Sequence, residues 1–438
     1  MPCYYGAFFM ILIYAHISSP RLQYICRFIF TELIGTEFAI TVDSEEFSSY
    51  DGVKVNYSNK MIDPVELQVP DCGLLFEQGI KEQAIQCFTG NYYKAFFRMD
   101  IVGFYFDIFA ASFYLITRYE EYLPHLQDKY GRYDHENSLA FKENFLNYPL
   151  INLWAIELAE NLQSKFPGFK TQYPAFKFIP TYDIDIAYSY LYKGLVRNIA
   201  GFIRTPSMER IKVLLGIIRD PFDNFAWLDE LHKEISCDPV YFFLLAAKRG
   251  TYDKNIAPSS NAMWKLVKIH AKKYCVGIHP SWQSGDDLLL LKKEKAYLEA
   301  ITEKTITRSR QHYIRFQFPV TFRRLITAGI KDDYSMGYGS TNGFRASSAS
   351  SFYWYDLERE EETDLRIHPF CFMDANSYFE QHLTPQEASA ELNHYSTICK
   401  EVNGQLITVW HNNFLGTAHE FKGWKEIYEA FMQQITTQ

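Results

Sequence analysis

The chain is predicted to be an α/β protein of two domains, and three observations support this prediction. Its 438 residues are too many for one small hydrophobic core. Hydrophobic residues make up 47% and charged residues 22%, a composition typical of globular proteins. From Pro174 onward, apolar runs of strand length alternate with helical stretches, as they do in a parallel sheet or barrel.

The N-terminal part, residues 1–170, is predicted to be an α/β domain whose role the sequence does not indicate. Two short runs have strand character, Glu37–Val42 and Val53–Tyr57. Helices are expected over Asp107–Tyr122 and Asn147–Phe166. A Pro-Gly pair at residues 167–168 closes the second helix, so a domain boundary is expected between residues 166 and 174.

The C-terminal part, residues 174–438, is predicted to be the second domain. Its best-defined helix has Thr384 as N-cap, Pro385 at the first helical position and Glu387 three residues after the cap. The expected strands are Lys177–Asp183, Val240–Ala246, Tyr274–His279, Arg366–Phe372 and Gln405–His411. The expected helices are Asn224–Ile235, Asn261–Lys273, Asp287–Thr302 and Thr384–Val402.

Charge and composition limit the classes of partner and compartment. The formal net charge of −8 argues against a nucleic-acid-binding protein, which needs a basic surface to neutralise phosphates. The apolar run from Cys3 to Ala15 is too short to span a bilayer, and no Lys or Arg precedes it as in a signal peptide. The eight cysteines include no CxxC pair, so reduced, buried thiols are expected. We expect a cytoplasmic protein without a membrane span, in an oligomeric state that the sequence does not indicate.

The tripeptide Asp183-Ile184-Asp185 is the most informative feature of the chain. It follows the apolar run that begins at Phe176, and residues two apart in a strand point to the same side. Both carboxylates are therefore expected at the carboxyl end of a strand, where parallel α/β sheets place their chemistry. Two ionised carboxylates this close repel unless a cation lies between them or one takes a proton. The alternative is that one Asp caps a helix and the other faces water.

Three further polar clusters lie at or after predicted strands of the second region. His279 ends the apolar run Gly277-Ile278, and His411 ends the last expected strand. Arg310 and His312 stand close together in a polar connector. Each cluster alone has a structural explanation, because a lone histidine is usually packed and hydrogen-bonded. Together with Asp185, however, the imidazoles have the chemistry of metal ligands.

The order of these motifs resembles the polysaccharide deacetylase family with the NodB-homology catalytic domain. In that family the first motif is Thr-Phe-Asp-Asp or a variant with Asp-x-Asp, and residues 181–185 are similar to the variant. His279 stands where the second motif has its first histidine, Arg310 where the third motif begins, and His411 where the last strand ends. The resemblance covers about residues 174–438. It implies a distorted (β/α) barrel of NodB-homology type, in a branch with an N-terminal α/β domain.

The resemblance and the residue chemistry together imply a divalent metal, with Zn²⁺ expected, bound by Asp185 and His279. The family's second motif has another histidine four residues after the first, and this chain has Gln283 there. His312 is the candidate for the third ligand, with another group of the chain as an alternative. Coordination by water and Gln283, or loss of the metal, are the alternatives.

The expected catalytic residues are Asp183, His411 and Arg310. Asp183 would act as general base toward a water on the metal, and His411 would protonate the leaving amine. Arg310 would orient Asp183 and hold it ionised, by analogy with the family's third motif. Asp333 is a weaker candidate for tuning His411.

Tyr313, Arg345 and Trp410 are expected to bind substrate. The backbone N–H of Tyr313 would assist the developing oxyanion. Arg345 would contact an anionic or hydroxyl-rich substrate, with a structural ion pair as the alternative. Aromatic residues, at 17% of the chain, could line a carbohydrate cleft or fill apolar cores.

The leading functional hypothesis is a metal-dependent hydrolase that removes an acetyl or other acyl group from an amino sugar or glycan precursor. Two alternatives stay open. The enzyme could hydrolyse another non-peptide C–N bond, in a formamide or a cyclic amide. With Gln283 in place of histidine, the barrel could instead have lost catalysis and bind a glycan or a protein partner.

Overall fold

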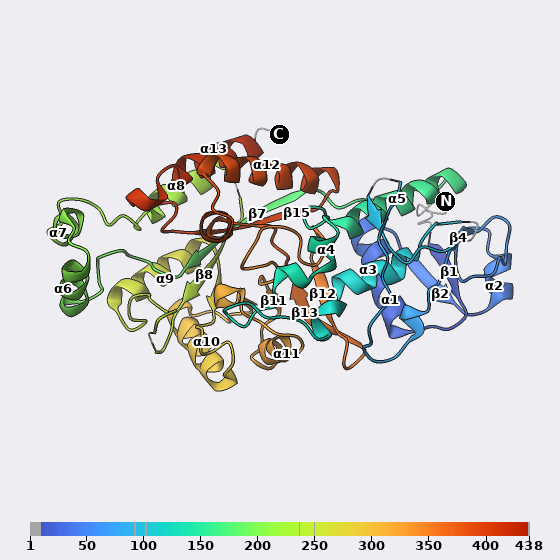
Figure 1. Ribbon diagram of the computed structural model, residues 1–438, viewed down its shortest axis with the longest axis horizontal. Coiled ribbons are helices and arrows are strands. Elements are labelled where there is room, and N and C mark those ends of the chain that lie inside the picture. The colour runs from blue at the N-terminus through green and yellow to red at the C-terminus, as the bar shows by residue number, and fades with distance from the viewer. Residues whose placement is uncertain (1–9, 92, 101–102, 236, 249, 437–438) are drawn as a thin grey trace, which may run out of the picture.

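The computed structural model describes residues 10–436 except 92, 101–102, 236 and 249. The start of the apolar run at Cys3 lies outside the described residues. Two sheets lie side by side along the longest axis of the molecule, the N-terminal one at one end and the larger one in the middle (Figure 1). The expected α/β class is confirmed.

The N-terminal sheet has four parallel strands in the order β2-β1-β3-β4. Asp107 caps α3, and its carboxylate accepts a hydrogen bond from the backbone N–H of Ala110. The strands are β1 (Ile11–Ala15), β2 (Phe38–Thr41), β3 (Val53–Tyr57) and β4 (Leu67–Val69). The helices are α1 (Pro20–Cys26), α2 (Ser44–Ser49), α3 (Ile108–Ile116), α4 (Leu139–Lys142) and α5 (Leu150–Lys165), with a small antiparallel pair, β5 (Phe88–Thr89) and β6 (Lys94–Ala95).

The second sheet has nine strands in the order β12-β13-β11-β10-β9-β8-β7-β15-β14, and only β12 and β13 pair antiparallel. No hydrogen bonds join its edge strands β12 and β14 among the described residues, so the expected distorted barrel is open there. The strands are β7 (Lys177–Ile184), β8 (Val240–Leu244), β9 (Cys275–His279), β10 (Arg308–Ser309), β11 (Asp332–Asp333), β12 (Phe352–Asp356), β13 (Glu361–Ile367), β14 (Phe372–Met373) and β15 (Gln405–His411).

Helices pack on both sides of this sheet, with α8, α12 and α13 along one side and α9, α10 and α11 along the other (Figure 1). The predicted capping box is present, because Thr384 and Glu387 exchange side-chain to backbone hydrogen bonds at the start of α12. The helices are α6 (Leu195–Arg204), α7 (Met208–Leu214), α8 (Phe225–Ile235), α9 (Asn261–Lys273), α10 (Leu288–Thr302), α11 (Val320–Thr327), α12 (Pro385–Glu401) and α13 (Trp424–Thr436).

One expected strand has the wrong bounds. The prediction of a strand over Arg366–Phe372 merged the end of β13 with the start of β14, and residues 368–371 between them are not in a strand. Pro369 lies between the two strands and has no N–H to donate, so the strand ladder is interrupted there. The short strands β10 and β11 were not predicted, since two-residue strands show no periodicity.

The two regions share a buried interface built on charged pairs. Glu121 of the N-terminal region accepts hydrogen bonds from Arg345 of the second region at 2.8 and 2.5 Å. Arg118 donates to the same carboxylate at 2.7 Å, and all three side chains are buried. Burial opposes ionisation of Glu121, but the charges of Arg345 and Arg118 lower its pKa below the usual value. The domain limits 1–170 and 174–438 stay a prediction.

Two smaller expectations concern the cysteines and the membrane. The seven described cysteines are free, and three of them, Cys26, Cys371 and Cys399, are buried, whereas Cys275 is exposed. Among the residues that the structure describes, no helix combines the length and the apolar character required to cross a bilayer.

Candidate metal centre

The two aspartates of the sequence motif project from the end of β7 into one pocket. Asp183 is the penultimate residue of β7 and pairs in register with His411 at the end of β15. Asp185 follows the strand directly, and both carboxylates line the pocket. Tyr182 points to the other face, where its hydroxyl contacts His232. The strand period therefore separates the pocket face from the packed face.

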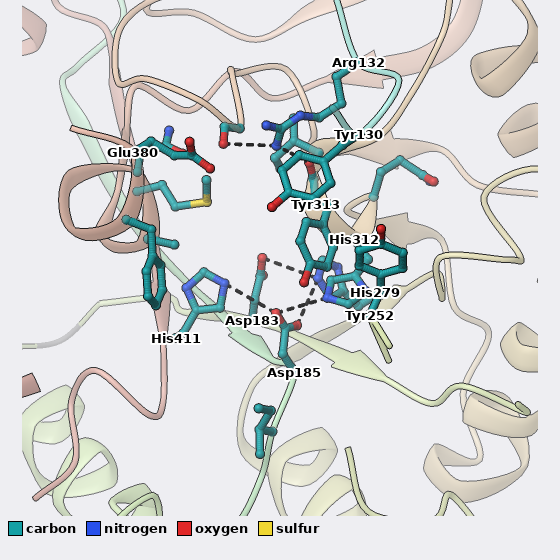
Figure 2. Close-up of a pocket in the computed structure, with 18 of the residues that line it drawn as sticks. Tyr130, Arg132, Asp183, Asp185, Tyr252, His279, His312, Tyr313, Glu380 and His411 are labelled. Atoms are coloured by element: carbon teal, nitrogen blue, oxygen red, sulfur yellow. Dashed lines mark hydrogen bonds and ion pairs between the residues drawn. The ribbon is translucent and has the colours of Figure 1, made fainter. Parts of the chain in front are cut away.

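Asp185, His279 and His312 form a group whose potential ligand atoms all lie within 4.8 Å of one another. The Nε2 atom of His279 lies 3.1 Å from Asp185 Oδ1, and the Nε2 atom of His312 lies 3.3 Å from Asp185 Oδ2. Both imidazoles are buried. Figure 2 shows these side chains converging at the bottom of the pocket. The three ligands expected from the sequence are thus brought together.

The hydrogen bonds on the far side of each imidazole fix how the rings face the carboxylate. His279 Nδ1 lies 2.6 Å from the backbone carbonyl of Arg310, which can only accept, so this nitrogen carries the proton. In the neutral ring, Nε2 then presents a lone pair to Asp185 Oδ1. That oxygen is buried and has no hydrogen-bond partner among the described residues. Two facing lone pairs require a cation between them or an added proton.

His312 has the same arrangement with a carboxylate as its outer partner. Its Nδ1 lies 3.0 Å from Asp253 Oδ1, and Asp253 is buried. Such a carboxylate orients a metal-binding imidazole and increases its basicity. Burial opposes the charged form of His312, but the charges and hydrogen bonds of Asp185 and Asp253 raise its pKa to about 9.

The donor set fits a divalent metal. One carboxylate and two imidazoles suit Zn²⁺ or a similar ion, and three protein ligands leave positions for water or substrate. Gln283 is exposed and does not line the pocket, so His312 is the residue that completes the group. Of the alternatives left open by the sequence, the geometry favours the one with His312.

Asp183 lies beside this group and is paired with Arg310. Arg310 Nη1 donates a hydrogen bond of 2.8 Å to Asp183 Oδ1, and its Nε donates to the backbone carbonyl of Tyr334 at 2.9 Å. The guanidinium also packs 4.6 Å from the centroid of the Phe242 ring. Both charged groups are buried, and each compensates the other. Asp183 is therefore held in one orientation, with its second oxygen 3.7 Å from His279 Nε2.

His411 approaches the group from the opposite side of the pocket (Figure 2). Its Nδ1 lies 2.6 Å from Asp374 Oδ1, and its backbone N–H donates to Asp374 Oδ2 at 2.7 Å. Its Nε2 points inward and lies 3.6 Å from Asp185 Oδ2. Burial alone would lower the pKa of His411, but Asp374, Asp185 and Asp183 raise it to about 10.

Asp333 does not tune His411, contrary to the weaker expectation. Its carboxylate accepts hydrogen bonds from Ser309 and Ser335, and burial raises its pKa to about 6. The residue that contacts His411 is Asp374, which directly follows the two-residue strand β14. A strand of that length has no sequence signal, so the carboxylate could not be assigned to a strand end.

Above the metal group the pocket has a volume of about 510 Å³ and aromatic walls. Tyr130, Tyr252 and Tyr313 line it, with ring centroids 5.2 Å apart for Tyr130 and Tyr313 and 5.4 Å apart for Tyr252 and Tyr313. Trp282 stacks on Tyr252 at 4.0 Å and supports this wall from behind. Glu380 stands on the opposite wall (Figure 2).

The N-terminal region reaches into this pocket through the turn at residues 127–133. Arg132 Nη1 donates hydrogen bonds to the carbonyl oxygens of Tyr313 at 2.9 Å and Gly339 at 3.0 Å. Its Nε is paired with Asp128 at 2.6 Å, and the guanidinium lies 4.7 Å from the Tyr130 ring centroid. The turn is therefore fixed to the second region. This contact could not be predicted from the sequence, because no local pattern indicates which part of the other region a turn will contact.

Two of the predicted substrate-binding side chains lie elsewhere. Arg345 is buried in the ion pair with Glu121, which is the structural alternative considered above. Trp410 is buried against Tyr428, at a ring distance of 4.6 Å, on the opposite face of β15 from His411. Strand alternation forces this outcome, since neighbours in a strand cannot both face the pocket. Tyr313 does line the pocket.

Comparison with known proteins gives one family match and several similar structures. Residues 11–167 match the model of a family of unknown function, DUF7033. No curated protein matches the sequence. A solved structure from Mycobacterium smegmatis that is named as a polysaccharide deacetylase has a TM-score of 0.40 and 12% identity, covering 60% of this chain and 85% of that chain.

Two other solved structures are similar to the same extent. Puue allantoinase has a TM-score of 0.39 and 9% identity over 60% of this chain and 84% of its own. A protein from Pseudomonas aeruginosa PAO1 named as a polysaccharide deacetylase has a TM-score of 0.39 and 11% identity over 60% of this chain and 85% of its own. Structures with this family name are thus among those similar to the chain.

Proposed function

We propose that the protein is a metal-dependent hydrolase that removes an acetyl or similar acyl group from an amino sugar or glycan precursor. One observation carries the proposal: the Asp183–Arg310 pair and the His411–Asp374 pair flank the Asp185, His279 and His312 group from two sides. A base and an acid on opposite sides of a metal group are what hydrolysis of an amide requires.

Asp185, His279 and His312 would hold the metal, and we propose Zn²⁺. When bound, such an ion acts as a Lewis acid toward the substrate carbonyl and makes water more acidic. The contacts with Asp253 and with the Arg310 carbonyl keep both imidazoles oriented for this task. The chain would thereby present three ligands and leave an open side toward the pocket.

Asp183 is the proposed general base. Its carboxylate lies next to the metal group, within 3.7 Å of His279, and Arg310 fixes its orientation. A base held in this way can accept a proton from an attacking water without having to reorganise. Arg310 is thus a positioning residue.

His411 is the proposed general acid. With a pKa of about 10 it is protonated at neutral pH, and its Nε2 faces the pocket. It can therefore deliver a proton to the nitrogen that leaves when the C–N bond breaks. Asp374 contacts the ring at Nδ1 and accepts a hydrogen bond from the backbone N–H of His411, and its charge stabilises the charged form of the ring.

The pocket walls support a sugar substrate. Aromatic rings stack on the apolar faces of sugars, and Tyr130, Tyr252 and Tyr313 offer such surfaces above the metal group. The backbone N–H of Tyr313 is the proposed donor to the oxyanion, as expected from the sequence. The proposal retains the cytoplasmic location expected from the sequence.

The test is an assay of the Zn²⁺-loaded protein on N-acetylated amino-sugar oligomers, with acetate as the measured product. We expect acetate release that falls by at least about 100-fold in Asp183→Asn and in His411→Ala. Asp286→Asn is the matched control, because Asp286 is exposed and does not line the pocket.

The other outcomes distinguish the alternative activities. Release of formate, or of a ring-opened product from a cyclic amide, would show that the enzyme hydrolyses another type of C–N bond. Tight binding of the oligomers without any turnover, equal in wild type and both variants, would contradict hydrolysis altogether and leave a glycan-binding barrel.

A further inference from the structure

The segment between β7 and α8 forms a helical hairpin, α6 and α7, at the end of the molecule opposite the N-terminal sheet (Figure 1). Its outer surface is unusually apolar. Of the 23 large hydrophobic side chains that are exposed among the described residues, 11 lie between residues 192 and 218. A patch of this density on a folded protein indicates an interaction surface.

Helix α6 is amphipathic, but its apolar face points toward solvent instead of toward the core of the protein. Leu195, Val196 and Ile203 are 75%, 81% and 75% exposed, and Ile199 and Phe202 continue the same stripe at helical spacing. Asn198, outside the stripe, is buried and donates hydrogen bonds to the carbonyl oxygens of Tyr190 and Gly194. A helix that packed its apolar stripe inward would have the reverse arrangement.

The hairpin is held by specific hydrogen bonds, so the exposure of its apolar side chains does not result from a loosely packed segment. At its base, the buried carboxylate of Asp220 accepts hydrogen bonds from the backbone N–H groups of Ser189, Tyr190 and Leu191 at 2.7, 2.8 and 2.9 Å. Between the helices, Arg210 donates to the carbonyl oxygen of Asn198 at 3.2 Å. Polar contacts thus fix the inner side while the apolar side faces out.

The hairpin is also strongly basic in an acidic protein. Residues 193–220 contain six Lys and Arg residues and two acidic residues, a formal charge of +4, whereas the whole chain carries −8. Two copies of this face brought together would repel each other, which argues against a second copy of the chain as the partner. An anionic surface would instead be attracted.

We infer that the α6–α7 hairpin binds the surface of an anionic lipid bilayer, with its apolar stripe in the interface and its basic residues at the lipid headgroups. A high amphipathicity, Leu, Ile and Phe on one side and Lys and Arg on the flanks are the properties of helices that lie in the plane of a membrane. Arg204 at the end of α6 and Lys212 on α7 are exposed, so their long side chains are available to contact the headgroups. This inference is independent of the proposed hydrolysis.

The test is flotation of the full-length protein with vesicles of phosphatidylcholine alone and of phosphatidylcholine with phosphatidylglycerol. We expect binding to the anionic vesicles and at least tenfold weaker binding to the neutral ones. Replacing the stripe in Leu195→Ser, Val196→Ser, Ile203→Ser should weaken binding at least about 100-fold. The matched control is Leu289→Ser, Val320→Ser, Ile269→Ser, which removes the same exposed residue types from other helices and should bind like wild type.

A second variant tests the charges without touching the apolar stripe. Arg204→Gln with Lys212→Gln should weaken binding to anionic vesicles by about fivefold per charge. Added salt should also weaken the binding of the wild-type protein. Equal flotation of wild type and the stripe variant would overturn the inference. So would a wild-type dimer in sedimentation equilibrium that the stripe variant dissociates, if neither protein binds vesicles.

Discussion

Both sheets of this protein consist mainly of parallel strands, yet among the described residues the group of potential metal ligands lies at the strand ends of the second sheet. In the N-terminal sheet, β1 is followed by His16, which is largely exposed and lies 3.8 Å from Asp71. In the second sheet, Asp183 near the end of β7 and His279 at the end of β9 are buried, and each is hydrogen-bonded to Arg310. A position at a strand end is therefore not sufficient for a chemical site. The polar side chains also need buried partners that orient them.

We propose that the N-terminal region shapes the pocket and takes no part in the chemical step. It forms one wall of the pocket with Tyr130 and fixes that wall through Arg132. A second connection, Glu121 to Arg345, ties the two regions together away from the metal group. If this division is correct, changes in the second region should abolish metal binding or turnover, and changes in the N-terminal region should alter stability or substrate affinity.

The largest effect is expected for Asp185→Asn, which removes the carboxylate that faces both imidazoles. Zn²⁺ affinity should fall by more than about 100-fold, because the charge that offsets the cation is lost. Isothermal titration of the metal-free protein measures this directly. His16→Ala with Asp71→Asn is the control in the other sheet, and it should leave the affinity unchanged. Equal losses of Zn²⁺ affinity in both variants would contradict the difference between the two sheets.

A large effect on stability is expected for Glu121→Gln in the interface between the regions. The variant leaves the buried guanidinium of Arg345 without its counter-charge and leaves Arg118 with Glu120 alone, which costs about 3–5 kcal/mol. Urea unfolding measures this loss. Glu77→Gln, which weakens a partly exposed pair with Lys81, should change stability by less than about 1 kcal/mol.

The difference in stability between wild type and Glu121→Gln should depend on pH. The pKa of Glu121 is lowered on folding, so its contribution is present above the ordinary value of 4.5 and is lost as the pH falls. The difference in the free energy of unfolding between wild type and Glu121→Gln should therefore become smaller in acid. A gap that widens as the pH falls would contradict the assignment of Glu121 as an ionised partner.

The sequence indicated the candidate ligands but not the residues that support them. Asp183, Asp185, His279 and His411 could be found because each follows an apolar run long enough to be recognised as a strand. Asp253 could not, because it lies in a connection without periodicity, and its contact with His312 exists only in the folded chain. The strand alternation that places Trp410 behind the sheet was available in the sequence, but its aromatic character had favoured a binding role.

A smaller effect on chemistry is expected for Asp374→Asn. The variant keeps the shape of the side chain but removes the charge that raises the pKa of His411. We expect kcat to fall by about 100-fold with little change in KM, because the acid is needed only as the C–N bond breaks. The alkaline limb of the pH profile should also move to lower pH. Asp333→Asn, whose carboxylate contacts serines instead, should leave the position of that limb unchanged.

The smallest effect, and the one that most directly tests the role of the N-terminal region, is expected for Tyr130→Ala. Loss of one stacking surface is worth about 1.4 kcal/mol, or tenfold in affinity. Since the ring lies on the wall above the metal group, it should bind the ground state and the transition state alike, so KM should rise and kcat should stay constant. Leu126→Ala, at an exposed position close to the same turn, is the control. A fall in kcat with unchanged KM would mean that the N-terminal turn takes part in the chemical step, and the division between shape and chemistry would have to be abandoned.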